Sequence, residues 1–186
     1  NDTTEYKLPN PIGQYGIMKL MGERLVEDYG RRGCFDYTIV RPSAVYGEND
    51  VEDRVVSKFF AAAMNNKTIH VKGAGEYLDF TYVEDTAMGI GLAAMNSTAN
   101  NNTYNITRSP EKGITLGQAA ELIVKIAGQG TIQVNERDNN FPSRGQLNIV
   151  RAQNDFSFSP TVNIEEGFQD YYDWLSNSVY WSQKTV

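Results

Sequence analysis

The chain has 186 residues, of which 40% are hydrophobic and 11% aromatic, so it can bury a core of one or two compact units and is too apolar to be disordered. Its formal net charge of −6 excludes a general nucleic-acid-binding protein, because such proteins are normally basic. No apolar run approaches a membrane span and no signal-peptide pattern opens the chain, so we expect a cytoplasmic protein without membrane contact. Cys34 is the only cysteine, which excludes an internal disulfide and a cysteine-based metal cluster.

The first half of the chain alternates between helical and strand patterns. Pro9 and Pro11 end an extended lead-in, after which Met18, Met21 and Leu25 recur at helical spacing. Later segments alternate between β-rich runs and amphipathic patterns. The elements predicted here are a helix over 12–29, a strand over 37–40, a loop over 43–50, a helix over 55–63, a strand over 68–71, a turn over 72–75 and a strand over 80–83.

The second half continues in the same way. Asp85 is placed to cap a helix that carries Met88 and Met95. Thr115 and Gln118 have the spacing of a capping box, which predicts a helix from there to Gly128. The other elements predicted are a loop over 96–102, a strand over 104–106, a strand over 131–134, a polar loop over 137–146 and a helix over 164–175. Because helices and short strands alternate, the predicted class is α/β.

Tyr15 and Lys19 are the first residues whose spacing indicates chemistry. Four residues apart on a helix, their side chains project from one face and can meet a shared ligand. A phenol with a pKa near 10 is a poor base at neutral pH, and a neighbouring ammonium stabilises its anion. Such a pair can take a proton from a substrate hydroxyl. Taken alone, however, this spacing more often places a packed ring beside a solvated amine, because Lys stems commonly lie along apolar surface.

The surrounding sequence favours the chemical interpretation. In order, it carries Tyr15-x-x-x-Lys19 followed by Glu23, then a Tyr-Thr-Ile-Val-Arg-Pro-Ser-Ala-Val-Tyr-Gly run at 37–47. The further matching segments are 69–75, 78–85, 104–107, 115–116 and 142–145. With these segments the chain resembles the extended short-chain dehydrogenase/reductase family, specifically its nucleotide-sugar epimerases and dehydratases, over nearly its whole length.

The resemblance implies the C-terminal part of a doubly wound, Rossmann-like NAD-binding domain in residues 1–50. Residues 51–186 would form mainly a small α/β nucleotide-sugar domain, with some segments returning to the first. Tyr15 would be the general acid/base, and Lys19 would hold the nicotinamide ribose of NAD, or of NADP. The remaining residues that the resemblance implies are Pro42, Ser43, Ala44 and Val45 beside the cofactor, and Ser43, Val71 and Arg144 at the nucleotide-diphosphate sugar, with Arg144 at the diphosphate. A homodimer is also expected.

Some family features differ or are missing. Leu78 stands where relatives usually carry Arg, Met18 where Ser or Thr is common, and Ser43 and Ala44 where many relatives have a substrate-contacting Asn. The glycine fingerprint that binds a dinucleotide is not found in the sequence. We therefore expect a fragment that is inactive alone, from a parent that is an NAD-dependent nucleotide-sugar 4-epimerase. The alternatives are a 4,6-dehydratase, an NADP-dependent reductase, and a non-catalytic module that binds sugar nucleotides or serves in assembly.

Overall fold

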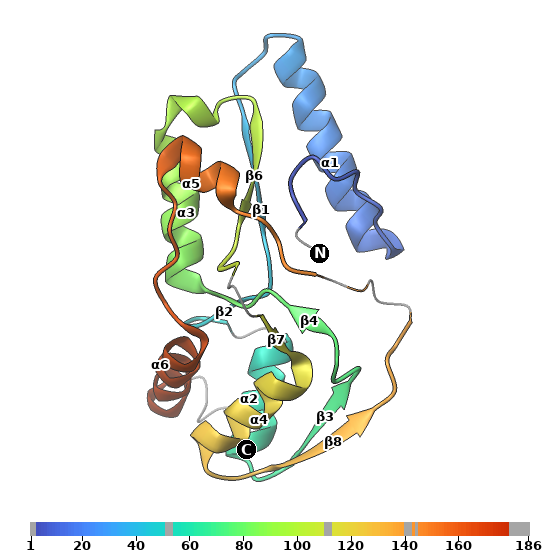
Figure 1. The fold of residues 1–186 in the computed structure, drawn as a ribbon, viewed down its shortest axis with the longest axis vertical. Coiled ribbons are helices and arrows are strands. Elements are labelled where there is room, and N and C mark those ends of the chain that lie inside the picture. Colours follow the sequence, from blue (N-terminus) through green and yellow to red (C-terminus); the bar gives the residue numbers. More distant parts are fainter. Residues whose placement is uncertain (1–2, 51–53, 110–112, 140–142, 144, 179–186) are drawn as a thin grey trace.

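Helices and short strands alternate along the chain in the computed structural model, which describes residues 3–50, 54–109, 113–139, 143 and 145–178 (Figure 1). No helix of this described part is both long and apolar enough to cross a lipid bilayer. The elements are α1 (Gly13–Arg31), β1 (Thr38–Pro42), β2 (Val45–Tyr46), α2 (Val55–Met64), β3 (Thr68–Lys72), β4 (Tyr77–Leu78), β5 (Thr81–Tyr82), α3 (Val83–Met95), the short 3-10 helix η1 (Ser97–Ala99), β6 (Asn102–Ile106), β7 (Ile114–Thr115), α4 (Leu116–Ala127), β8 (Thr131–Asn135), α5 (Val150–Phe156) and α6 (Ile164–Asn177).

The two longest strand pairs are both parallel, although their partners are far apart in sequence. β1 pairs with β6, with Thr38 opposite Asn102 and Pro42 opposite Ile106. β3 pairs with β8, with Thr68 opposite Thr131. Two-residue pairs complete the pattern, parallel between β2 and β5 and antiparallel between β4 and β7. Parallel pairing needs long crossover connections, and here α2, α3 and α4 lie in those connections.

The described residues form a hydrophobic core of two clusters. One lies between β6, α3 and α5 and is built around Tyr104, Ile106 and Phe158, each essentially fully buried. The other lies between α2, α4, α6 and β3. Its centre is an aromatic group packed edge to face, in which the rings of Tyr46 and Phe168 are 4.9 Å apart at 83°. The upper part of Figure 1 holds the first cluster and the lower part the second.

Most predicted elements are confirmed with small shifts at their ends. The capping box is present, because Thr115 Oγ1 accepts from the Gln118 N–H and Gln118 Oε1 accepts from the Thr115 N–H. The predicted cap at Asp85 is wrong. Tyr82 is the N-cap of α3, and the Asp85 carboxylate lies buried inside the first turn. There it accepts from the backbone N–H groups of Thr161, at 2.9 Å, and Val162, at 3.1 Å, which ties the segment before α6 to α3.

Gly89 and Gly91 on α3 provide a matched test of how closely this helix packs on the sheet. A Cβ at Gly89 would lie 2.5 Å from Ile106 Cγ2 and 2.8 Å from Phe158, both buried side chains, whereas a Cβ at Gly91 would meet nothing within 4 Å. We expect Gly89→Ala to lower the free energy of unfolding by about 1–3 kcal/mol through overpacking. Gly91→Ala should raise it by about 0.5–1 kcal/mol through helix propensity. Urea unfolding measures both, and equal effects would contradict the close approach at Gly89.

Candidate active site

Tyr15 and Lys19 lie on the first turns of α1 and project from one face of it. Tyr15 is 76% exposed, and the Lys19 Nζ lies over its ring, 5.5 Å from the centroid. This is cation–π distance, so the ammonium contacts the face of the phenol ring. Among the described residues none donates a hydrogen bond to the Tyr15 hydroxyl or accepts one from it, and α1 has no buried residue. The pair is therefore displayed on an open surface where a ligand can reach both groups.

The direction of the chain brings this pair toward the end of β1. In Figure 1 α1 and β1 run in opposite directions, so the first turn of α1 and the carboxyl end of β1 point toward the same end of the molecule. Arg41, the penultimate residue of β1, forms a bidentate ion pair with Glu23 of α1. Its Nε lies 2.8 Å from Oε1 and its Nη2 lies 2.6 Å from Oε2. Ligands of open α/β sheets bind outside the carboxyl ends of the strands, and the start of α1 points toward that end of the molecule.

The loop Pro42–Val45 continues from β1 at this end. Pro42 is exposed, Ser43 and Ala44 are half-buried, and Val45 begins β2. Ala44 has φ 39°, in the left-handed region that a side chain with Cβ rarely adopts, and its carbonyl accepts from the Thr81 N–H at 3.4 Å. The loop is therefore held in one strained conformation by its contact with β5.

Ala44 provides a test of that strain. The left-handed conformation costs an Ala about 1–2 kcal/mol of stability, and Gly avoids most of this cost. Gly also has more conformational freedom in the unfolded chain, which costs about 0.4–1 kcal/mol of stability. We expect Ala44→Gly to raise the free energy of unfolding by about 0.5–1 kcal/mol. Ala61→Gly, a control inside α2, should lower it by about 1 kcal/mol. Loss of stability in both variants, measured by urea unfolding, would count against strain at Ala44.

Asp79 organises the neighbouring loops. Its buried carboxylate accepts from the Thr107 hydroxyl at 2.8 Å, from the Ser109 N–H at 3.0 Å and from the Leu147 N–H at 3.4 Å. Burial raises the pKa of Asp79, and these hydrogen bonds oppose the shift. One carboxylate thus joins the end of β4, the segment that follows β6 and the segment that precedes α5.

The residues predicted at the sugar nucleotide are only partly brought together. Val71 is fully buried, backbone included, and its side chain packs in the core, so it presents no accessible surface to a ligand in this structure. Arg144 lies outside the described residues. Its neighbour Ser143 donates to Glu76 Oε2 at 2.9 Å, and Glu76 also pairs with Arg137 at 2.9 Å. Ser143 is therefore anchored to the turn between β3 and β4.

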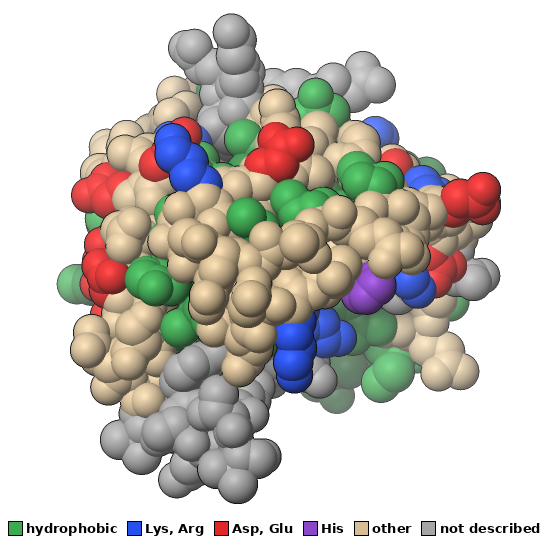
Figure 2. All heavy atoms as spheres, turned by 90° about the horizontal axis from the view of Figure 1, so that it is seen from below, with side chains coloured by type: hydrophobic (Ala, Val, Ile, Leu, Met, Phe, Trp, Pro, Cys, Tyr) green, Lys and Arg blue, Asp and Glu red, His purple; other side chains and the backbone are tan. Residues whose placement is uncertain are grey.

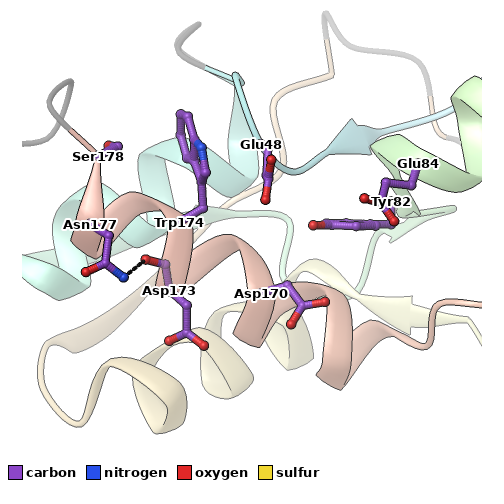
Figure 3. A pocket seen from close by; sticks show the side chains of 8 residues that line it. All are labelled: Glu48, Tyr82, Glu84, Asp170, Asp173, Trp174, Asn177 and Ser178. Atoms are coloured by element: carbon purple, nitrogen blue, oxygen red, sulfur yellow. Dashed lines mark hydrogen bonds between the residues drawn. The ribbon is translucent and has the colours of Figure 1, made fainter.

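Two hollows of the described surface stand out, and neither contains a predicted site residue. One, of about 410 Å³, lies between α6, α3 and the segment after β2, with Tyr82 and Trp174 facing it among acidic side chains (Figure 3). Its acidic residues are Glu48, Glu84, Asp170 and Asp173. This charge repels a diphosphate. The other is an apolar hollow of about 570 Å³ on α1, lined mainly by Ile17, Leu20, Met21 and Leu25.

The face in Figure 2 has no broad basic patch, because basic and acidic side chains are scattered over it. An anionic ligand on this face would therefore depend on a few particular cations. Among the described residues, no group of three His, Cys, Asp or Glu side chains is arranged to hold a metal ion.

Sequence reasoning predicted the Tyr15/Lys19 pair, whose role stays a prediction, and missed the groups that hold its surroundings. The partners of Arg41 and of Asp79 lie far away in sequence, and no periodicity links them. Glu23 and Arg41 do lie inside the segments that carry the family resemblance, which is the one signal that could have singled them out.

The model of the NAD dependent epimerase/dehydratase family matches residues 1–107. Because this is more than half of the chain, the chain belongs to that family. Matches to solved structures agree with this assignment. They confirm the α/β class and the Rossmann-like relationship that the sequence predicts.

Individual relatives agree with the family assignment. A putative UDP-glucose 4-epimerase of Methanocaldococcus jannaschii is 28% identical over 91% of this chain and 55% of its own length. The UDP-glucose 4-epimerase of Thermotoga maritima, solved with UDP-glucose, is 27% identical with a TM-score of 0.83, covering 94% of this chain and 57% of that one. The UDP-glucuronic acid 4-epimerase of Bacillus cereus, solved with UDP-glucuronic acid and NAD, is 23% identical with a TM-score of 0.87, covering 95% and 56%. The chain thus spans about half the length of these relatives.

Proposed function

We propose that the gene product carrying this chain is an NAD-dependent nucleotide-sugar 4-epimerase, with Tyr15 as its general acid/base. The observation that carries the proposal is the exposed Tyr15 with the Lys19 ammonium over its ring, at the start of a helix that runs opposite to β1. The family to which the chain belongs and the 4-epimerases among its relatives support the same reaction class.

In the proposed reaction Tyr15 takes the proton of the sugar C4 hydroxyl. The phenol is solvent-exposed and free of protein hydrogen bonds among the described residues, so its oxygen can approach that hydroxyl. The adjacent ammonium of Lys19 stabilises the negative charge that develops on the phenol. A 4-keto sugar would form as hydride leaves C4, and when hydride returns to its other face Tyr15 would give the proton back to the same oxygen. One residue thus serves as base and then as acid.

The residues around the pair fit a nicotinamide nucleotide. Lys19 supplies exposed donors for the ribose hydroxyls, and the Pro42–Val45 loop supplies a fixed, partly apolar surface at the sheet end. NAD, when bound, provides the hydride acceptor and donor at the sugar carbon. We propose Lys19, Pro42, Ser43, Ala44 and Val45 as the part of this chain that holds it.

For the substrate, we propose that Arg144 binds the diphosphate and that the part of the chain around the second hydrophobic cluster binds the nucleotide sugar. A guanidinium fork matches phosphate oxygens two at a time. Support comes from the anchoring of Ser143 to Glu76 and from the exposed donors of Lys72 on the neighbouring strand β3. On this proposal the cluster around β1, β6, α3 and α5 belongs to the cofactor half. The cluster around α2, α4, β3 and β8 belongs to the substrate half.

Isothermal titration calorimetry with NAD and with UDP-glucose or UDP-glucuronic acid tests the proposal on the complete gene product. We expect binding of NAD, and conversion of one UDP-sugar to its C4 epimer detected by NMR. Release of a 6-deoxy-4-keto sugar would identify a dehydratase instead. Absence of NAD binding by the complete gene product would remove the enzyme hypothesis and favour a non-catalytic module.

A further inference from the structure

We propose that the Glu23–Arg41 ion pair is a positioning device that sets the Tyr15/Lys19 pair against the Pro42–Val45 loop. The inference rests on the proposed function for its catalytic consequence. Its structural part, that this pair fixes the start of α1 relative to β1, stands on the contacts alone.

The first ground is that few other polar contacts attach α1 to the sheet. None of the residues of α1 is buried. Among the described residues, Glu23–Arg41 is the only side-chain hydrogen bond or ion pair that joins α1 to the β1–β6 sheet. The other charged contacts of α1 stay within or just beyond the helix, as Arg24 with Glu27 and Asp28 with Arg31 and Arg32. Gly30 packs closely on the Tyr37 ring at the end of α1, so the Glu23–Arg41 pair is the polar contact that fixes the earlier part of the helix along β1.

The second ground is the geometry of the pair. Two parallel N–H···O contacts of 2.8 and 2.6 Å fix orientation as well as distance, which a single contact does not. The side chains are only 25% and 18% exposed, so water competes weakly for them. The Glu23 hydrogen bonds raise the pKa of Arg41, the direction expected for a cation held by its partner. This is a stiff link rather than a loose surface contact.

The third ground is where the pair lies along both elements. Glu23 is one helical turn after Lys19 and two after Tyr15, so the link lies about 12 Å along the helix from the phenol-bearing residue. Arg41 immediately precedes Pro42. Its Nη1 also contacts the carbonyl of Glu5 at 3.4 Å, and Glu5 Oε1 accepts from the Asn105 N–H of β6 at 2.8 Å. A shift of Arg41 would therefore move α1, the Pro42–Val45 loop and the N-terminal segment around Glu5 relative to one another.

A positioning role predicts a particular kinetic pattern. A misplacement of about 1 Å at reacting groups can cost up to about 10²-fold in rate without removing any binding contact. Breaking the pair should therefore lower kcat by about 10–100-fold, while KM for the UDP-sugar changes by less than about 3-fold. Glu23→Gln removes the charge at nearly constant shape, and Arg41→Lys keeps the charge but removes the fork. We expect both to show this pattern, and the exchanged pair Glu23→Arg/Arg41→Glu to recover part of kcat.

Asp28→Asn is the matched control, because it breaks exposed ion pairs on the same helix without touching the sheet. It should leave kcat unchanged. Hydrogen–deuterium exchange of the α1 amides at residues 17–22 is the second readout. Exchange should accelerate in Glu23→Gln and Arg41→Lys but not in Asp28→Asn.

The two readouts separate this inference from the proposed function. If the unmodified gene product converts no UDP-sugar, the proposed function fails, and amide exchange still decides whether the pair fixes α1. The inference would be overturned if the α1 amides of both Glu23→Gln and Arg41→Lys exchanged at the wild-type rate. It would also be overturned if both variants kept the wild-type kcat. Loss of kcat only in proportion to the fraction unfolded, followed by circular dichroism, would overturn it too.

Discussion

Replacing Tyr15 by Phe should lower the turnover of the complete gene product on its UDP-sugar by at least ~10²-fold, the usual scale for loss of a general acid/base. The substitution removes one oxygen and keeps the ring over which the Lys19 ammonium lies, 5.5 Å from the centroid. Substrate and cofactor contacts made by that ring therefore remain. We expect kcat to fall while KM changes little, because the lost group acts in proton transfer rather than in holding the substrate.

The exposure of Tyr15 makes the result interpretable. The side chain is 76% exposed and its hydroxyl has no hydrogen-bond partner among the described residues, so Phe leaves no buried group unsatisfied. The melting temperature should therefore stay within about 1 °C of wild type, since exposed substitutions of this kind change stability by less than about 0.5 kcal/mol.

Tyr29→Phe is the control for Tyr15→Phe. It makes the same chemical change near the far end of α1, where the ring stacks on Phe35 and is 47% exposed. Steady-state rates measured by NMR or a coupled assay should be unchanged in this control. Near-normal turnover of Tyr15→Phe would show that another group transfers the proton.

What sequence reasoning can predict in this chain, and what it misses, is divided by the range of the interactions involved. Helical periodicity and capping are local, so α1, α4 and the Thr115 box were predictable from neighbouring residues. Asp85 also looked local, as an acidic residue at a helix start. Its carboxylate instead serves Thr161 and Val162, more than seventy residues on. A competing long-range partner decided its role.

The same distinction holds at the candidate site. Tyr15 and Lys19 lie four residues apart on one helix, so a local sequence motif is enough to predict the pair. The Glu23–Arg41 pair and the Asp79 hydrogen bonds depend on tertiary structure that brings separate loops together. Val71 shows a further limit, because alternation along β3 does not say which face meets the core until α2 and α4 are placed. α5 was missed because seven residues carry little periodic signal.

Asp79→Ala should lower the free energy of unfolding by about 2–4 kcal/mol, because each buried donor left without an acceptor costs about 1–3 kcal/mol and removal of the buried charge offsets part of that. The donors concerned are the Thr107 hydroxyl and the N–H groups of Ser109 and Leu147. Asp79→Asn keeps one acceptor oxygen and should lose less. Asp173→Asn, at an exposed carboxylate on α6, should stay within about 0.5 kcal/mol of wild type.

The pH dependence of this effect has a definite sign. Burial raises the pKa of Asp79 above its unfolded value, so the folded state favours the protonated carboxyl. The stability that Asp79 contributes is then fully present below about pH 4 and is lost as the pH rises through the folded pKa. Urea unfolding between pH 4 and 7 should therefore show the advantage of wild type over Asp79→Asn shrinking as the pH rises. A growing advantage would mean that the hydrogen bonds from Thr107 and Ser109 outweigh burial and depress the pKa instead.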